Sequence, residues 1–503
     1  MRFGLRLLFA VLALAIGVPF VAGLHALSPG AALVQLQLGD LLFTDGRYRD
    51  AIDAYGRATG VEDRALQSVA RRGLVRAALR IAEFEIARKA ALWLRTAAPR
   101  DPDALALYGD SLWAAGLFDL AERAYRDALA IEPEHARGRH GLARALAGRS
   151  QLDAALAEAQ SAVAADPRDP EIHHTVGEIY ERMHRFEEAA LAYHNYLNVL
   201  PERDRTEKMF WAQSEIRFLE SFGTRVPFDV EKGAGIARHM VGFRLVNDKV
   251  VVKASVNGSE ASEFVVDTGA EQTVVSRTTA QRLGIVPIVH TISAGVGALG
   301  LRGLQVGRLD SLEIGTLKMK NVPCLIKNPP LIGFPTPETE SLSPLALGLS
   351  MSVDYARRQL TFGPAADDGP ADFELPLWMN RLATVPGIVN THATNFVVDT
   401  GGEVISINTE TANVMPVSGA TRRIPVRVYG TSGWDPDAYL LSGVDLSLSA
   451  IRFPNLPVIV LNLRAPSVLL GYRIGGIVGH KFLSRYRVGI DLTRSVLRLK
   501  KVN

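Results

Sequence analysis

Cysteine is almost absent from the sequence. The one cysteine among 503 residues, Cys324, excludes an intrachain disulfide, and a single thiol also excludes a structural zinc site built on cysteines. Its apolar neighbours Val322, Pro323, Leu325 and Ile326 predict a buried strand position, because a free cysteine usually behaves as a small apolar group. No cross-link stabilises the chain, so its fold must rest on packing.

An excess of either charge is also missing. The 56 Lys and Arg residues and the 53 Asp and Glu residues leave a formal net charge of +3, so composition gives no reason to expect a nucleic-acid partner. The length predicts two or three domains. His173 and His174 are adjacent and would face different sides of a helix, so they do not predict a metal site. We expect neither a metal nor a cofactor.

Charge is again missing near the N-terminus. Arg2 and Arg6 are followed by residues 7–24, an uncharged run of 18 residues that is just long enough to span a bilayer. Residues 1–26 are therefore expected to be a signal peptide or a membrane anchor, and Ala22 and Gly23 would suit cleavage. Both alternatives predict export, to a periplasmic or a membrane-anchored location with the bulk outside the cytoplasm. Contact with a membrane is expected only through this segment.

The sequence does contain a repeat with a period near 34 residues. Alanine recurs at spacings of 36, 34, 34 and 34, at Ala51, Ala87, Ala121, Ala155 and Ala189. Proline recurs every 34 residues, at Pro99, Pro133, Pro167 and Pro201. Tyrosine follows three of the alanines, at Tyr55, Tyr125 and Tyr193. The pattern predicts pairs of helices that approach closely at small residues, with an aromatic ring between neighbouring pairs and a proline after each second helix.

This pattern resembles the tetratricopeptide repeat over residues 31–205, which would form an all-α solenoid of five repeats. The second and fourth copies depart from it, with Ala91 and Ala159 in the aromatic position and Val75 in a position where the first copy has Gly39. Residues 206–225 predict a capping helix and a linker. Because such solenoids present a concave surface, the resemblance implies a protein partner on the array. The alternative is that the array only spaces the remainder from the membrane.

From about residue 226 the chain alternates apolar and polar residues between turn signals, which predicts β-structure. The hexamer Phe-Val-Val-Asp-Thr-Gly occurs twice, at 264–269 and 396–401, and similar segments follow both copies. Two equivalent lobes are therefore predicted. Residues 295–300 also match Gly-x-Gly-x-x-Gly, but strand-like alternation follows them instead of a helix. We expect a hairpin tip there and no nucleotide site.

The duplicated motif is similar to that of the pepsin-like and retropepsin-like aspartic peptidases. The resemblance covers residues 226–503, with lobe 1 at 226–366 and lobe 2 at 367–503. The expected fold is thus an all-α tetratricopeptide solenoid followed by an all-β bilobal aspartic peptidase with the short lobes of the retropepsin type. The resemblance implies that Asp267 and Asp399 are the catalytic carboxylates. It also implies four residues that support the active-site loops: Thr268, Gly269, Thr400 and Gly401.

Two neighbouring carboxyls cannot both ionise easily, so one would act as general base on water while the other, protonated, polarises the scissile carbonyl. The expected function is that of an aspartic endopeptidase acting on a protein or peptide that the repeats recruit, with short-peptide cleavage retained without the repeats. The alternative is a non-catalytic peptide-binding scaffold on a degenerate peptidase fold. The second loop has Gly402 where the first loop has Ala270. In lobe 1 either Gly348 or Gly333 is expected to occupy the position of Gly479 in lobe 2. Tyr429 is a candidate flap residue.

Overall fold

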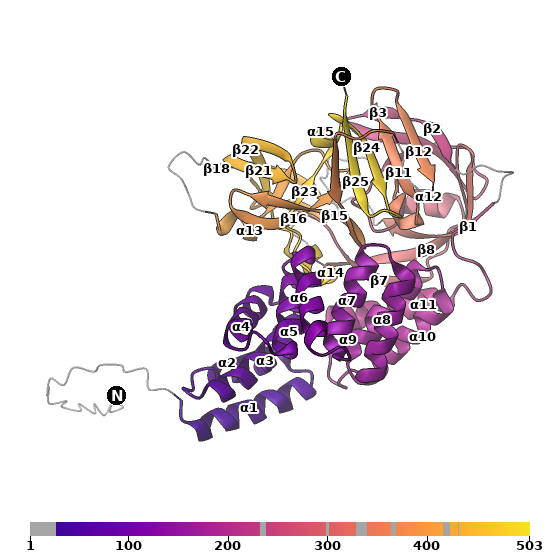
Figure 1. The fold of residues 1–503 in the computed structure, drawn as a ribbon. Coiled ribbons are helices and arrows are strands. Elements are labelled where there is room, and N and C mark those ends of the chain that lie inside the picture. Colours follow the sequence, from indigo (N-terminus) through magenta and orange to yellow (C-terminus); the bar gives the residue numbers. More distant parts are fainter. Residues whose placement is uncertain are drawn as a thin grey trace, which may run out of the picture.

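The computed structural model describes residues 27–231, 238–297, 301–327, 340–363, 369–415, 423–430 and 432–502 (Figure 1). The N-terminal half is helical and the C-terminal half is built mainly of strands. The expected signal peptide or anchor, residues 1–26, lies outside the described residues. Among the helices of the described part, none is both long and apolar enough to cross a membrane.

Residues 29–220 form helices that pack in consecutive pairs, as expected for five repeats, and a last helix caps the fifth pair. They are α1 (Pro29–Thr44), α2 (Tyr48–Ala58), α3 (Arg64–Arg80), α4 (Phe84–Ala97), α5 (Pro102–Ala114), α6 (Phe118–Ile131), α7 (Ala136–Gly148), α8 (Leu152–Ala165), α9 (Pro170–Arg182), α10 (Phe186–Val199) and α11 (Glu207–Glu220). The helices α4, α6, α8 and α10 each end two residues before one of the recurring prolines, because the residue before a proline disfavours helical geometry.

The recurring aromatic residue fills the space between neighbouring repeats, as the sequence predicts. A Cβ atom on Gly39 would lie 2.6 Å from the Tyr55 ring, and one on Gly73 of the next repeat would lie 2.4 Å from the same ring. Only glycine therefore leaves room for Tyr55 on both sides. In the second repeat, which lacks the tyrosine, Val75 and Ala91 are both fully buried. In this repeat the larger side chain, Val75, therefore stands on the first helix of the pair, and the small residue, Ala91, stands on the second.

The repeat array closes on itself. The Tyr48 hydroxyl of the first repeat donates a hydrogen bond of 2.6 Å to the Asp204 carboxylate, which follows the fifth repeat. Arg80 also binds Asp204, at 2.8 Å, and Arg203 forms an ion pair of 2.9 Å with Asp45. Asp204 is only 1% exposed. The concave face is therefore bounded by the first repeat and by the segment after the fifth, and it forms a cavity of about 590 Å³.

Lobe 1 comprises β1 (Asp229–Val230), β2 (His239–Gly242), β3 (Arg244–Val246), β4 (Lys249–Val256), β5 (Ser262–Val266), β6 (Thr273–Ser276), α12 (Arg277–Arg282), β7 (Val289–Ala294), β8 (Leu301–Ile314), β9 (Leu317–Lys327), β10 (Glu340–Leu342), the 3₁₀ turn η1 (Leu345–Leu347), β11 (Ser350–Asp354) and β12 (Gln359–Gly363). Lobe 2 comprises β13 (Phe373–Pro376), β14 (Trp378–Asn380), β15 (Leu382–Val389), β16 (His392–Val398), β17 (Ser406–Asn408), α13 (Thr409–Asn413), β18 (Arg423–Pro425), β19 (Val428–Gly430), β20 (Gly433–Asp435), β21 (Tyr439–Leu448), β22 (Ile451–Leu461), α14 (Arg464–Leu470), β23 (Gly476–Val478), α15 (His480–Leu483), β24 (Tyr486–Asp491) and β25 (Val496–Lys501).

The two lobes repeat one topology. Neighbouring strands follow the order β9-β6-β10-β5-β4 in lobe 1 and β22-β17-β23-β16-β15 in lobe 2, with the same parallel and antiparallel pairings. A third sheet, β13-β25-β24-β11-β12-β2, joins the lobes through the antiparallel pair β11–β24. The fold is an all-α repeat solenoid followed by a two-lobed β-structure, which confirms the fold class.

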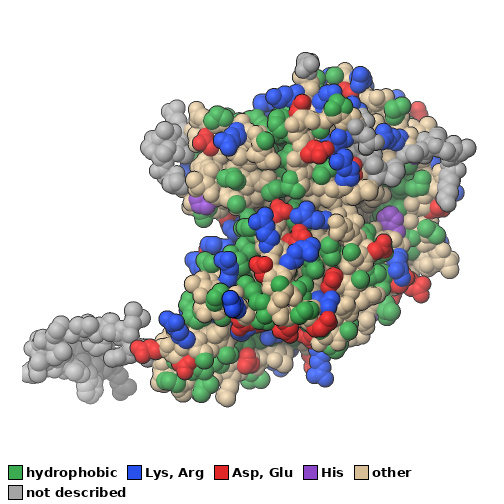
Figure 2. Space-filling model, in the orientation of Figure 1, with side chains coloured by type: hydrophobic (Ala, Val, Ile, Leu, Met, Phe, Trp, Pro, Cys, Tyr) green, Lys and Arg blue, Asp and Glu red, His purple; other side chains and the backbone are tan. Residues whose placement is uncertain are grey.

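The array packs directly on the lobes. Trp378 of β14 is 1% exposed and lies in one hydrophobic cluster with Trp113, Phe118 and Tyr472. The Arg149 guanidinium of the fourth repeat stacks 4.1 Å from the centre of the Trp378 ring. In Figure 2 the array and the lobes form one continuous surface, with basic and acidic side chains along their junction. Two parts that the sequence treats as separable thus share a core.

Candidate active site

The two Asp-Thr-Gly motifs begin where buried strands end. Asp267 follows β5 and Asp399 follows β16. In both strands the phenylalanine and the last valine are fully buried, so the aspartate is the first residue free to leave the sheet. The Asp267 N–H donates to the Leu342 carbonyl at 2.8 Å, and the Asp399 N–H donates to the Val478 carbonyl at 3.1 Å. The two loops are therefore held in equivalent ways.

Thr268 and Thr400 connect the two loops through four crossed hydrogen bonds. The Thr268 hydroxyl donates to the Val398 carbonyl at 2.6 Å and accepts from the Thr400 N–H at 3.0 Å. The Thr400 hydroxyl donates to the Val266 carbonyl at 2.7 Å and accepts from the Thr268 N–H at 3.1 Å. Both threonines are buried, so the bonds are shielded from water. They fix the two loops against each other within one chain.

The glycines bring each carboxyl against the opposite loop. A Cβ atom on Gly269 would lie 2.5 Å from the Asp399 carboxyl carbon, and one on Gly401 would lie 2.6 Å from that of Asp267. The Gly269 N–H donates to Asp267 at 3.0 Å, whereas Asp399 accepts two such bonds, each of 2.8 Å, from Gly401 and Gly402. Gly402 thus supplies a backbone donor that has no counterpart in the first loop.

The surroundings favour a proton shared by the pair. Burial, the charge of Asp399 and a hydrogen bond with its carboxyl raise the pKa of Asp267 to about 8, against the smaller opposing effect of the Gly269 N–H. One of the two carboxyls therefore stays protonated at neutral pH. Such a pair can take a proton from water at one oxygen and give a proton at another.

The residue equivalent to Gly479 is Ser343, and the expectation of Gly348 is wrong. Leu342 pairs with Val266 as Val478 pairs with Val398, so the next residues in the chain correspond. Gly348 instead caps η1, with a φ of 71°. Gly333, the other candidate, lies outside the described residues.

A serine fits the first lobe because of a local hydrogen bond. The Ser343 hydroxyl donates to the Ala270 carbonyl of the first loop at 2.5 Å. In lobe 2 a Cβ atom on Gly479 would lie 2.7 Å from the Val404 carbonyl oxygen, so that position requires glycine. The sequence offered no signal for Ser343 beyond its place after an apolar strand.

Two glycine-rich hairpins, one from each lobe, meet at their tips. The Gly295 N–H donates to the Ser432 hydroxyl at 3.0 Å, and the Ser432 N–H donates to the Val296 carbonyl at 2.9 Å. The strand β8 follows the first tip, as the sequence predicts, although residues 298–300 lie outside the described part. Tyr429 pairs with Trp434 on the second hairpin, and both are exposed. Tyr429 therefore lies on an exposed hairpin whose tip contacts the other lobe, and its expected role as a flap residue stays a prediction.

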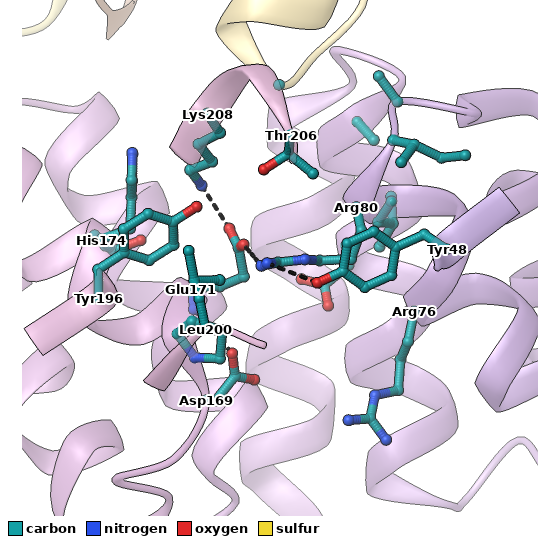
Figure 3. Close-up of a pocket in the computed structure, with 18 of the residues that line it drawn as sticks. Tyr48, Arg76, Arg80, Asp169, Glu171, His174, Tyr196, Leu200, Thr206 and Lys208 are labelled. Carbon is teal, nitrogen blue, oxygen red and sulfur yellow. Dashed lines mark hydrogen bonds and ion pairs between the residues drawn. The ribbon is translucent and has the colours of Figure 1, made fainter. Parts of the chain in front are cut away.

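The cavity inside the repeat ring is lined by paired charges. Figure 3 shows the Glu171 carboxylate between Arg80 and Lys208, and the Lys208 ammonium lies 2.5 Å from it. Arg76 also lines the cavity, its side chain points away from this group in Figure 3, and it is exposed to solvent. Burial lowers the pKa of His174, so this ring is neutral at physiological pH. No group of metal-ligating side chains occurs among the residues that the structure describes.

Four family models match parts of the chain. An Aspartyl protease model matches residues 252–351, and a gag-polyprotein aspartyl protease model matches residues 385–474. Each matched segment contains one of the two Asp-Thr-Gly motifs. Tetratricopeptide repeat models match residues 72–136 and 112–179. The chain is a tetratricopeptide repeat array fused to a retropepsin-like protease region. No curated protein matches this repeat–protease chain.

Several solved tetratricopeptide repeat proteins are similar to part of the repeat–protease chain. A thermophilic protein of Thermus thermophilus is 24% identical with a TM-score of 0.30, covering 34% of this chain and 93% of that one. YrrB, whose structure is described as having an unusual peptide-binding site, is 18% identical with a TM-score of 0.23, at 34% and 87% coverage. A protein from Parabacteroides merdae ATCC 43184 is 17% identical with a TM-score of 0.30, at 39% and 75% coverage.

Proposed function

We propose that the chain is an aspartic-type endopeptidase in which Asp267 and Asp399 form the catalytic pair. The observation that carries the proposal is that each carboxyl packs against the glycine of the opposite loop, while crossed threonine hydrogen bonds hold both loops. The ionised carboxyl removes a proton from water, which then attacks the peptide carbonyl, and the protonated carboxyl stabilises the developing oxyanion. The proton taken from water passes to the leaving amine, and the pair returns to its shared-proton state.

The alternative is a peptide-binding scaffold without catalysis. Intact loops argue for catalysis, because a site that only bound peptides would not need both carboxyls and both threonines in place. The deciding experiment incubates the purified full chain with a mixed peptide library and identifies new termini by mass spectrometry. Asp267→Asn and Asp399→Asn serve as matched controls. Cleavage by the wild type alone supports the peptidase, whereas binding without any new terminus supports the scaffold.

We further propose that the repeat array binds a protein partner or substrate through its cavity. The ring closure limits the space to about 590 Å³, which suits a chain end or a short loop better than a long extended segment. A benzoylphenylalanine photo-crosslinker at Arg76 tests this, because Arg76 faces the cavity and is exposed. The control position is Leu191, which is 62% exposed and does not line the cavity. Peptides captured equally at both positions would contradict the proposal.

For the location we propose export, with residues 1–26 as signal or anchor. The apolar surface of the first described helix, α1, supports the proposal that a membrane lies nearby. Its exposed side chains include Leu33, Val34 and Leu41, and Asp40 is its one charged residue. Extraction of the native protein from cell fractions at alkaline pH, followed by sequencing of its N-terminus, separates a retained anchor from a cleaved signal. Recovery of the intact chain from the cytoplasm would contradict export.

A further inference from the structure

The two active-site loops are followed by a pair of equivalent glutamates that have different partners. Glu271 and Glu403 each lie four residues after the aspartate of their lobe. Glu403 forms an ion pair of 2.7 Å with Lys481 of its own lobe, and both side chains are more than half exposed. Glu271 pairs with Arg381, which comes from the opposite lobe, and this pair is mostly buried. The internal symmetry of the lobes is therefore also broken at this position beside the first loop.

Arg381 is held by the repeat array. It is the single residue between the strands β14 and β15 and adopts a φ of 62°, a left-handed conformation found in tight turns. Its guanidinium lies 5.1 Å from the centre of the Trp211 ring on the capping helix α11. A cation over an indole ring is attracted to it more strongly where the pair is partly shielded from water, and the Arg381 side chain is 30% exposed. The residue thus bridges the loop of lobe 1 and the last helix of the array.

Carboxylates of the array surround the same guanidinium. Burial lowers the pKa of Arg381, but the charges of Glu271, Glu178, Glu181 and Glu215 together raise it above its usual value. Glu178 and Glu181 come from α9 of the array, and Glu215 comes from α11. A cavity of about 450 Å³ lies among them, and its wall also includes Glu271 and the two residues that follow it. The first active-site loop therefore rests on a charged layer that the repeats complete.

The strand that leads into the second loop also contacts the array, through a different group. Asn395 of β16 lies four residues before Asp399 and is 1% exposed. Its side-chain amide donates to the Gly116 carbonyl, in the turn between α5 and α6, at 3.3 Å and to the Arg473 carbonyl at 2.8 Å. Each catalytic loop is thus supported from the side of the repeats.

We propose that Arg381 is a positioning residue for the catalytic pair, and that the repeat array supports the active site through it. The inference rests on the proposed peptidase function for its kinetic test alone. Without the guanidinium, Glu271 would lose its ion pair in a largely buried place and would face the carboxyls of Glu181 and Glu215 across the cavity. The cost of this unpaired carboxylate would displace the loop that starts at Asp267. A displacement of about 1 Å can lower kcat roughly a hundredfold.

The test compares Arg381→Met with Lys481→Met, which removes the cation of the equivalent exposed pair. For Arg381→Met we expect hydrogen–deuterium exchange to become faster than in the wild type in residues 264–276, and to change less in residues 396–408. On a short peptide we expect kcat to fall about tenfold to hundredfold while KM changes little, because the loop holds reacting groups and not the substrate. Lys481→Met should change neither quantity. Arg381→Lys keeps the charge and should recover part of the exchange protection.

The double variant Arg381→Met/Glu271→Gln separates positioning from a simple loss of stability. This double variant also removes the Glu271 carboxylate that Arg381→Met leaves unpaired, so the melting temperature should recover. The value of kcat should not recover, because the contact between the Arg381 guanidinium and the Trp211 ring is still missing. Unchanged exchange in residues 264–276 of Arg381→Met overturns the proposal, as does full recovery of kcat in the double variant. If Arg381→Met does not fold, the same comparison is made with Arg381→Lys. If the wild type cleaves no peptide, the exchange data still decide the role of Arg381.

Discussion

The ring of Trp378, from the first hairpin of lobe 2, meets the ring of Trp113, from the third repeat, edge to face with centres 6.3 Å apart and planes at 88°. Phe118 packs against the same ring at 5.5 Å. Because Trp378 is almost completely buried in a cluster formed by residues of the repeats and of lobe 2, the array covers an apolar surface of the lobes. The two halves of the chain therefore depend on each other for stability.

We expect Trp378→Ala to lower the free energy of unfolding of the full chain by about 3–5 kcal/mol, as for other large aromatic residues removed from a core. Urea denaturation followed by circular dichroism measures the change. The matched control is Trp434→Ala, because Trp434 is 46% exposed and should cost little. A fragment of residues 226–503 should aggregate or unfold more easily than the full chain. A fragment as stable as the full chain would contradict the shared core.

The sequence predicted the features that local patterns encode. The repeats show in the spacing of alanine, proline and tyrosine because every repeat must solve the same packing problem. The pair of aspartates shows in an identical hexamer that occurs twice. The ring closure by Asp204 and the bridge from Arg381 to Glu271 left no such trace, because they join distant segments that carry no shared motif. Ser343 was missed because sheet register, and not residue type, defines its equivalence to Gly479.

Asp267→Asn and Asp399→Asn should each lower kcat by roughly 10²–10⁴-fold, since each carboxyl has its own proton-transfer step. Neither should destabilise the fold, because burial already disfavours the ionised form of Asp267 and the amide is neutral. Cleavage of a library peptide and thermal melting are measured on the same samples. Glu403→Gln, an exposed change close to the second loop, is the control for charge alone. Full activity in either folded aspartate variant rules out the shared pair.

Peptide cleavage should decline on the alkaline side with a midpoint near pH 8. Burial first, and then the charge and hydrogen bond of Asp399, raise the pKa of Asp267 to about 8. The active form holds one proton between the two carboxyls, so activity is lost as pH rises through this value and that remaining proton leaves. The pH profile of kcat/KM measures it. An alkaline midpoint below pH 6 would mean that the pair is more open to water than the structure shows.

Folding stability should also fall as pH rises. Burial, helped by the charges of Glu178 and Glu271, raises the pKa of Glu181 from 4.5 to about 7. Between these values the folded chain holds a proton that the unfolded chain releases, so the stabilising contribution is complete below pH 4.5 and is lost as pH rises through 7. Thermal melting from pH 5 to pH 8 should show a decline that Glu181→Gln reduces. Glu187→Gln, on the exposed face of α10, should leave the decline unchanged.

The crossed hydrogen bonds between the loops predict a difference between two substitutions of Thr268. Thr268→Val keeps the shape but leaves the Val398 carbonyl and the Thr400 N–H without their partner, and each buried unpaired group costs roughly 1–3 kcal/mol. Thr268→Ser keeps the hydroxyl and should cost less than about 1 kcal/mol. Chemical denaturation measures both. Thr384→Val is the control, because the buried Thr384 hydroxyl donates only one bond, of 3.2 Å, to the Trp378 carbonyl. Equal losses for Thr268→Val and Thr268→Ser would show that the hydroxyl does not hold the loops together.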